Sequence, residues 1–174
     1  DPTFAFEVVA IVRDGMRRMY EQQEDVYYYV TLMNENYPHP GMPEGCEAGI
    51  LKGLYQLSDG GKTQKKGQRV QLMGSGSILR EVMFAAELLK QDFGIAADVW
   101  SAPSYNELRR DGMATERWNR LHPTERARKS HVEQCLEGHD GPVIAATYYM
   151  RNYADQVREY VQAAGRRYTV LGTD

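Results

Sequence analysis

The sequence predicts an α/β fold built from two helix–sheet–helix units whose sheets are mainly parallel. Strand-like and helix-like segments alternate along most of the 174 residues, which is typical of parallel sheets covered by helices. A run of aromatic and β-branched residues at 26–32 has the composition of a strand buried on both faces. Residues 58–69, SDGGKTQKKGQR, contain no apolar side chain and are the best linker candidate. We therefore expect one unit at 1–57 and a second at 70–174.

The first unit is expected to begin with a helix at residues 2–21. Asp1 can act as its N-cap, and Pro2 suits the first helical position. Apolar residues at three- and four-residue spacing predict a buried stripe on this helix, made of Val8, Val9, Val12, Met16, Met19 and Tyr20. The strand at 26–32 and a proline-containing loop follow. A second helix is expected at about 44–53.

The second unit continues the alternation of strands and helices. Its first strand, 70–74, leads through a Gly-Ser-Gly-Ser turn into an amphipathic helix at 77–93. Further strands are expected at 98–102, 142–147 and 168–171. Further helices are expected at 104–111, with a charged helical stretch running on to Leu121, at 132–136 and at 153–161. A basic loop at 124–129 separates the first two of these helices.

Composition excludes several classes of function. A net charge of −3 gives no basic field that would attract nucleic acid or an anionic membrane. No apolar stretch reaches the roughly 20 residues of a membrane span, so we expect a cytoplasmic protein without a membrane segment. Cys46 and Cys135 are far apart and lack metal-ligand spacing, which predicts reduced packing residues and no disulfide. The four histidines are scattered, so no metal ligands are predicted.

The loop after the expected strand at 26–32 collects polar side chains. Asn34, Glu35, Asn36, Tyr37 and His39 would lie beyond the carboxyl end of that strand, where ligands commonly bind on parallel sheets. Pro38, Pro40 and Pro43 each fix a backbone angle and stiffen the loop. Asn, Pro and Gly are also ordinary turn formers, and composition alone favours a surface loop over a catalytic one. From the residues alone, both interpretations stay open.

The Gly-Ser-Gly-Ser turn suggests a second kind of site. A strand, a glycine-rich turn and a helix can bind an anion at the helix amides, as in a stand-alone flavodoxin-like module for anions or nucleotides. The segment GSGSILRE lacks the third glycine of a dinucleotide motif and the Gly-Lys of a phosphate-binding loop. A tight structural turn with Ser77 as N-cap is therefore the favoured interpretation.

Several stretches together carry a family resemblance over essentially the whole chain. They are DPTFAFEVVAIVRDGMRRMY, YYYVTLMNENYPHPGMPEG, EAGILKGLYQL, VQLMGSGSILREV, DVWSAPSYNELRRDG, ERWNRLHP and YTVLGTD. These stretches closely resemble the homodimeric bacterial first component of the pyruvate dehydrogenase complex, a transketolase-like family. The combination of NENY with MPEG is more specific than any single glycine motif.

The resemblance implies an activity and a domain assignment. The family uses thiamine diphosphate with Mg²⁺ to decarboxylate pyruvate and to acetylate a lipoyl domain of the dihydrolipoyl acetyltransferase. Residues 1–57 would be the end of a pyrimidine-binding domain, 58–69 a linker, and 70–174 the start of a transketolase C-terminal-like domain. The family's diphosphate- and metal-binding motif and its activating glutamate would lie outside this chain. The chain alone is therefore expected to be inactive.

The resemblance also selects site residues in the NENY loop. It implies that Glu35 and His39 are catalytic, with Asn34, Tyr37 and Phe4 lining the substrate or cofactor pocket. A histidine can donate to a substrate carboxylate or shuttle a proton, and a nearby carboxylate can orient it. The alternatives to the enzyme assignment are the flavodoxin-like binding module and a purely structural dimerisation domain.

Overall fold

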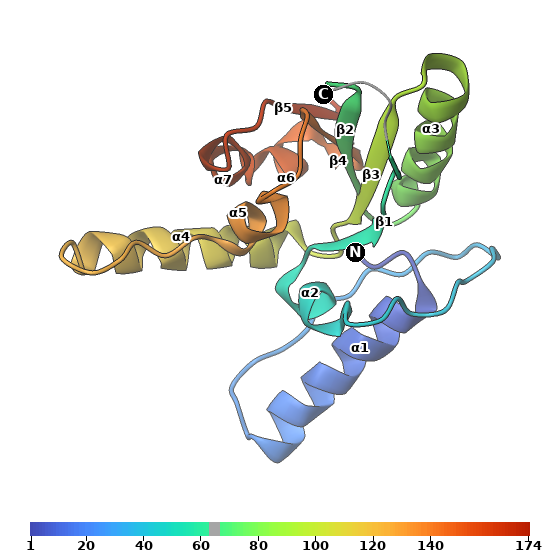
Figure 1. The fold of residues 1–174 in the computed structure, drawn as a ribbon. Coiled ribbons are helices and arrows are strands. Elements are labelled where there is room, and N and C mark those ends of the chain that lie inside the picture. Colours follow the sequence, from blue (N-terminus) through green and yellow to red (C-terminus); the bar gives the residue numbers. More distant parts are fainter. Residues whose placement is uncertain (63–66) are drawn as a thin grey trace.

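The computed structural model describes residues 1–62 and 67–174, and these form one mixed sheet with helices on both faces (Figure 1). The strands are β1 (Tyr55–Ser58), β2 (Arg69–Gly74), β3 (Ala96–Ser101), β4 (Val143–Met150) and β5 (Tyr168–Thr173), in the order β1-β3-β2-β4-β5. Strand β1 runs antiparallel to β3, and every other pair is parallel. The predicted α/β class with a mainly parallel sheet is confirmed.

The helices fall into two sets that cover opposite faces of the sheet. Helix α3 (Ile78–Phe93) packs on one face, against β2, β3 and β4. The other face carries α5 (His131–Leu136), α6 (Arg151–Asp155) and α7 (Arg158–Ala163), while α4 (Tyr105–Leu121) projects beyond the body of the molecule. The larger apolar core lies on this second side and includes Met73, Trp100, Leu108 and Val143.

Residues 1–54 lie beside this sheet and contribute helices but no strand. They form α1 (Ala5–Met16), a π-helical turn η1 (Arg17–Glu21) and α2 (Glu47–Lys52), which packs against α1. The prediction of a separate sheet in the first unit is therefore wrong for this chain. Residues 26–32, predicted as a strand, have no regular secondary structure. Residues 26–30 alternate between half-buried and exposed as in a strand, whereas Val30 and Thr31 are both half-buried. No neighbouring strand pairs with residues 26–32 in the described part of the chain.

The segment 58–69 connects two strands of this one sheet, because β1 precedes it and β2 begins at its end. The described ends of the segment are held in place. The Gly60 amide donates to Asp98 at 2.9 Å, and the Arg69 side chain donates to the Gly61 carbonyl. Residues 63–66, which include Lys65 and Lys66 of the predicted linker, lie outside the described residues. The assignment of 1–57 and 70–174 to two domains stays a prediction.

The predicted buried stripe of the first helix is only partly correct. Val9, Val12, Met16 and Tyr20 are exposed, with Tyr20 at 72%, while Val8 and Met19 are half-buried. The buried residues of α1 are Glu7, Ala10 and Gly15. The apolar spacing identifies a helix correctly but predicts the wrong buried face. Glu7 can be buried because hydrogen-bond donors surround its carboxylate, as a buried polar group requires.

The start of α1 also differs from its prediction. The helix begins at Ala5 with Phe4 as the N-cap residue, and the Glu7 carboxylate accepts from the Phe4 amide at 2.9 Å. The side chain of Asp1 instead accepts from the hydroxyls of Ser75, Thr31 and Tyr148. The Glu7 carboxylate, in the first turn of the helix, therefore accepts from amides at the start of α1. The sequence predicted this role for Asp1.

The second unit follows the predicted order closely, with two differences. The predicted helix at 153–161 is divided into α6 and α7, and residues 105–121 form a single uninterrupted helix. Ser77 precedes α3, but its side chain makes no capping hydrogen bond. Cys46 and Cys135 are both free thiols, as expected.

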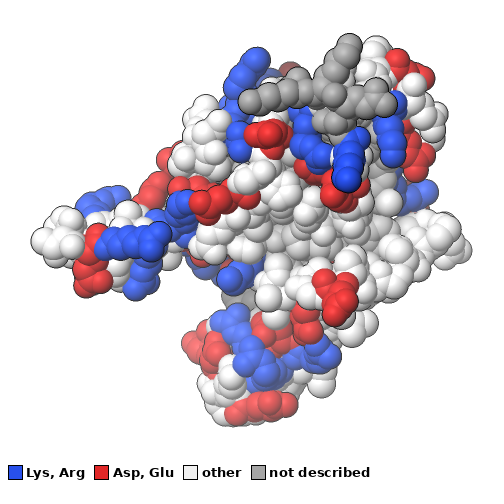
Figure 2. Space-filling view, viewed as in Figure 1, with Lys and Arg blue, Asp and Glu red and all other residues white. Residues whose placement is uncertain are grey.

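Charged side chains of both signs are mixed over the face shown in Figure 2, including α1 and the projecting part of α4. Among the described residues on this face, side chains of the two signs lie near one another, in agreement with the small net charge. Among the described residues, no helix is long and apolar enough to cross a membrane.

Candidate functional site

Residues 33–43, which we call the proline loop, pack against the beginning of α1. The Tyr37 hydroxyl donates to the Thr3 carbonyl. The His39 ring lies 4.6 Å from the Tyr37 ring and 6.4 Å from the Phe4 ring, in the second case edge to face. The Ala5 amide donates to Nδ1 of His39 at 3.1 Å. The structure thus brings three of the five predicted site residues together, and each helps to hold the loop on the helix.

The local sequence explains why His39 is in this place. The first amides of an α-helix have no partner within the helix and need an acceptor from elsewhere. Glu7 accepts from the amides of Thr3 and Phe4, and His39 accepts from the next one, that of Ala5. Pro38 and Pro40 on either side restrict the backbone of the loop. The imidazole is therefore fixed by a backbone contact as well as by ring packing.

The two other predicted site residues, Glu35 and Asn34, are exposed, as is His39. Glu35 is at the surface and forms an ion pair with Arg80 of α3, at 3.1 Å between Nη1 and Oε2. The Arg80 guanidinium also lies 4.7 Å from the centre of the Tyr37 ring. Asn34 is exposed. Glu35 and His39 share the loop, but among the described residues no hydrogen bond joins them.

The environment of Tyr37 fixes its charge state. Burial raises the pKa of the Tyr37 hydroxyl, and the Arg80 guanidinium acts in the opposite direction. Because the net shift is upward, the hydroxyl stays protonated at neutral pH and remains a donor to Thr3.

The Gly-Ser-Gly-Ser turn, the alternative anion site, is filled from within the chain. The Ser75 hydroxyl donates to the Asp1 carboxylate at 2.8 Å, and the Tyr148 hydroxyl donates to the same group at 2.7 Å. The Gly76 amide donates to the Asp1 carbonyl at 3.1 Å. A carboxylate of the protein thus lies where an external anion would have to bind.

A cavity of about 470 Å³ lies between α1, residues 25–30 and the beginning of α4. Inside it the Tyr28 hydroxyl donates to Asp14 at 2.5 Å and accepts from Arg18 at 3.0 Å. None of the five predicted site residues lines this cavity. In the described part of the chain, no group of three or more His, Cys, Asp or Glu side chains could hold a metal ion.

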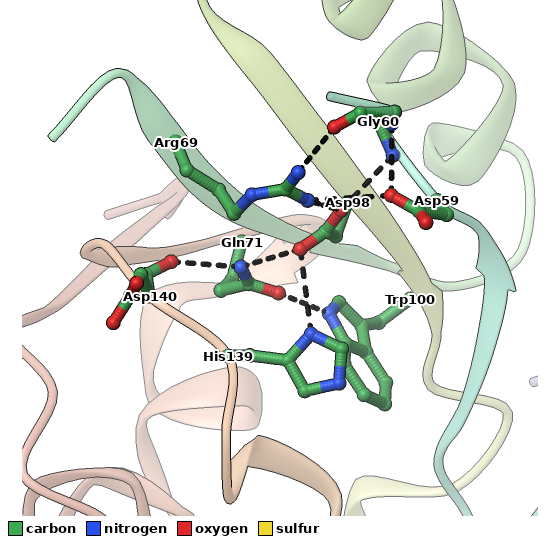
Figure 3. Close-up of polar contacts among 9 residues, drawn as sticks. Asp59, Gly60, Arg69, Gln71, Asp98, Trp100, His139 and Asp140 are labelled. Atoms are coloured by element: carbon green, nitrogen blue, oxygen red, sulfur yellow. Dashed lines mark hydrogen bonds and ion pairs between the residues drawn. The ribbon is translucent and has the colours of Figure 1, made fainter. Parts of the chain in front are cut away.

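A buried polar cluster around Asp98 was not predicted as a unit (Figure 3). Asp98 is fully buried in β3 and accepts from the Gly60 amide at 2.9 Å, from Gln71 at 2.7 Å and from Arg69. Nδ1 of His139 lies 3.4 Å away. Burial alone would raise the pKa of this carboxyl, but these hydrogen bonds outweigh it and lower the pKa to about 2.

The Asp98 cluster connects strands and loops, and its polar groups are occupied by hydrogen bonds within the protein. Gln71 also accepts from the Trp100 indole at 2.8 Å and donates to the Asp140 carbonyl at 2.8 Å. These contacts tie β2 and β3 to the loop before β4 (Figure 3). An acidic residue within the apolar run AADVWSA was the available signal, because a charge in a buried strand requires partners.

A second buried carboxylate, Glu7, was missed altogether. It has no exposed surface and accepts from the hydroxyls of Tyr55 and Ser101, each at 2.6 Å. It also accepts from the amides of Thr3 and Phe4, which directly precede α1. The signal in the sequence was a glutamate inside the apolar segment AFEVVAIV. Its partners are 48 and 94 residues away, and nothing in the local pattern identifies them.

Two families match adjoining parts of the chain. Residues 53–174 match the transketolase-like TK C-terminal domain, and residues 1–40 match the middle domain of the pyruvate dehydrogenase E1 component. The first match includes β1, which agrees with the position of β1 in the same sheet as β2 to β5.

Curated relatives align with all 174 residues. The chain is 58% identical to the pyruvate dehydrogenase E1 component of Pseudomonas aeruginosa and 55% identical to that of Cupriavidus necator. Over 177 aligned positions it is 52% identical to the Escherichia coli protein of the same name. In each case the alignment covers 100% of this chain but 19% of the relative, so the chain spans about a fifth of the length of the relatives it matches.

Proposed function

The chain belongs to the transketolase-like C-terminal domain family, and we propose that it is part of an enzyme that decarboxylates pyruvate and transfers the acetyl group to a lipoyl group. The support is the alignment of the whole chain with proteins named pyruvate dehydrogenase E1 component. We place the residues of this chain that take part in the reaction on the proline loop, with Glu35 and His39 as the reacting groups and Asn34, Tyr37 and Phe4 lining the pocket.

One observation carries the assignment of the site, namely the hydrogen bond from the Ala5 amide to Nδ1 of His39. A ring nitrogen that accepts a hydrogen bond cannot carry a proton, so the neutral ring has its proton on Nε2. The His39 side chain is exposed, and Nε2–H is therefore a donor directed away from the helix. Such a donor can bind a substrate carboxylate or exchange a proton with a reacting oxygen.

Glu35 has a different role in this proposal. Its carboxylate is exposed and forms an ion pair with Arg80. An ionised carboxylate can accept a proton or a hydrogen bond during the transfer step, whereas the Nε2–H of His39 can only donate at first. The loop thus offers one acceptor and one donor on the same segment of chain.

Thiamine diphosphate and Mg²⁺ are implied by the family, but the described residues do not provide a site for them. The described residues hold no metal-ligand group, and Asp1 occupies the glycine-rich turn. We therefore derive no step through either group and propose that their main binding residues lie outside residues 1–174. The proposal further includes a homodimer, the lipoyl domain of a dihydrolipoyl acetyltransferase as partner, and a cytoplasmic location.

The test uses single substitutions in a protein of the relatives' full length. His39→Ala removes the donor and Glu35→Gln removes the charge of the acceptor, and we expect each to lower the rate of pyruvate decarboxylation or lipoyl acetylation by on the order of 10²-fold. His122→Ala is the matched histidine control, because His122 stacks on Trp118 of α4 and touches no loop residue. Glu81→Gln, on the exposed face of α3, is the carboxylate control.

Wild-type rates in both loop variants, with cofactor affinity unchanged, would remove the assignment of the site. Equal losses in the loop variants and their controls would indicate a general effect of substitution and would also count against it. We expect the 174-residue chain alone to show no turnover of pyruvate. Turnover by the chain alone would contradict the proposal that the cofactor-binding residues lie elsewhere.

A further inference from the structure

One residue of the second unit contacts the proline loop at two points. Arg80 lies in the first turn of α3, where its Nη1 donates to Glu35 at 3.1 Å. The centre of its guanidinium lies 4.7 Å from the centre of the Tyr37 ring. An arginine can make both contacts at once because its planar, charged end both pairs with carboxylates and stacks on aromatic faces.

The contacts continue from Tyr37 to the imidazole. The Tyr37 ring is close to both groups: its centre lies 4.7 Å from the Arg80 guanidinium and 4.6 Å from the centre of the His39 ring. The Tyr37 hydroxyl is also bound to the Thr3 carbonyl, so the ring is held at its edge as well as on its face. A change at Arg80 would release Glu35 directly and would loosen His39 through Tyr37.

We propose that Arg80 is a positioning residue for the proline loop: it fixes Glu35 by an ion pair and His39 through the ring of Tyr37. This inference rests on the proposed function of Glu35 and His39. It adds a residue from the sheet-containing unit to a site that otherwise lies on residues 1–54, so α3 and the loop must be correctly placed against each other for the reaction.

The proposal predicts that activity and stability respond differently. The side chains of Arg80 and Glu35 are 40% and 59% exposed, and ion pairs at such positions contribute little to folding. A small displacement of a reacting group can nevertheless cause a large loss of rate. Removal of Arg80 should therefore slow the reaction and leave the thermal unfolding temperature unchanged.

The first experiment measures kinetics in a protein of the relatives' full length. We expect Arg80→Met to lower kcat on the order of tenfold while KM for pyruvate changes less than about twofold. Arg80→Lys retains a charge for Glu35 and for the Tyr37 face and should recover part of the lost rate. Arg110→Met is the matched control, since Arg110 also forms an exposed ion pair, in this case with Glu107 within α4. It should behave as wild type.

The second experiment reports on the loop without turnover. Carbethoxylation of histidines in the same protein, followed by peptide mass analysis, gives a modification rate for His39 and, as internal reference, for His122. We expect His39 alone to react faster in Arg80→Met, because its ring loses part of its support. A wild-type kcat in Arg80→Met would overturn the proposal. A loss of rate accompanied by a fall in unfolding temperature would also overturn it.

The two experiments also separate this inference from the proposed function. If His39→Ala and Glu35→Gln keep wild-type rates, the proposed function loses its site whatever Arg80 does. The modification rate of His39 then decides whether Arg80 orders the loop: a faster rate in Arg80→Met supports the contact, and an unchanged rate refutes it.

Discussion

The buried carboxylate of Glu7 in α1 accepts a hydrogen bond from the hydroxyl of Ser101, at the end of β3, at a distance of 2.6 Å. The two residues are 94 positions apart in the sequence. Tyr55, at the beginning of β1, donates to the same oxygen at 2.6 Å. Burial raises the pKa of the Tyr55 hydroxyl and the Glu7 charge raises it further, so the hydroxyl remains a donor. One carboxylate thus connects the first helix to the edge of the sheet.

This connection predicts a large loss of stability in Glu7→Ala. The substitution leaves two buried hydroxyls and the backbone amides of Thr3 and Phe4 without their acceptor. We expect a loss of about 3 kcal/mol or more in the free energy of unfolding. Glu7→Gln keeps one acceptor oxygen and should lose less. Urea unfolding of the 174-residue chain measures both, with the exposed Glu81→Ala as control, expected to stay within about 0.5 kcal/mol of wild type. Equal values for Glu7→Ala and Glu81→Ala would contradict the assigned role.

The order of the strands and helices in the second unit could be predicted from sequence because it depends on local periodicity. Strands β2 and β3 are apolar runs, and α3 has an amphipathic repeat, so each is visible within a short window. The polar partners of Glu7 and Asp98 were not visible, because they are decided by which distant segments meet after folding. The same reason explains the wrong buried face of α1, where one glutamate with four donors outweighs several valines and methionines.

The candidate site could likewise be predicted from sequence only in part. The resemblance supplied Glu35 and His39 by position in the loop, and the stiffness of the loop followed from its prolines. The sequence could not supply the acceptor role of His39 Nδ1 or the contact of Arg80 with Tyr37, because both depend on elements that are distant along the chain. Whether Glu35 and His39 act in the reaction stays a prediction.

The Asp98 cluster predicts a dependence of stability on pH in the acid range. The folded-state pKa of Asp98 is about 2, below its ordinary value of 3.8, so the folded state binds its proton less readily than the unfolded state. The stabilisation, about 2 kcal/mol, is complete above the ordinary pKa and is lost as the pH falls from about 4 to about 2.

Urea unfolding at several pH values between 2 and 7 tests this. Wild type should lose stability progressively below about pH 4. Asp98→Asn should be less stable than wild type at pH 7, because Arg69 then lacks its buried partner, and the difference between the two proteins should shrink as the pH falls. A constant difference across the whole range would show that Asp98 does not carry this effect.

We expect replacement of Gly112 in α4 by alanine to disturb packing, although alanine has the higher helix propensity. A Cβ atom at this position would lie 2.2 Å from Cζ of the buried Tyr160 in α7. Alanine at an ordinary helical site gains up to about 1 kcal/mol over glycine, but overpacking here costs about 1–3 kcal/mol. We expect Gly112→Ala to destabilise the chain in urea unfolding. Adding Tyr160→Leu should remove the clash, so the alanine should cost less in that background. An equal cost with and without Tyr160 would rule out this contact as the cause.

The glycine-rich turn predicts the absence of an external anion site. If phosphate or a nucleotide bound at the turn, a hundredfold excess over its dissociation constant would stabilise the chain by about 2.7 kcal/mol. The Asp1 carboxylate already accepts from Ser75 and Tyr148 there, so we expect thermal unfolding in phosphate to match that in chloride at equal ionic strength. A specific rise with phosphate or nucleotides would favour the flavodoxin-like alternative.

Residues 26–32 make a prediction about hydrogen exchange that depends on the length of the chain. The side chains of residues 26–30 alternate as in a strand, with Tyr27 and Tyr29 exposed at 89% and 85%. In the described part of the chain, no backbone hydrogen bond pairs residues 27–32 with a strand. Their amides should therefore exchange almost as fast as in an unfolded peptide when the 174-residue chain is measured.

The composition of this segment favours a strand buried on both faces, which requires a partner strand on at least one edge. If a longer chain supplies that partner, the amides of 26–32 should become strongly protected, and the exposed tyrosines should lose their access to solvent. Hydrogen exchange read by mass spectrometry on both proteins tests this, with Val70 to Met73 of β2 as a segment that should exchange slowly in each. Fast exchange of 26–32 in the longer protein as well would mean that the strand predicted from its aromatic and β-branched residues does not form, and that composition is a misleading guide for this segment.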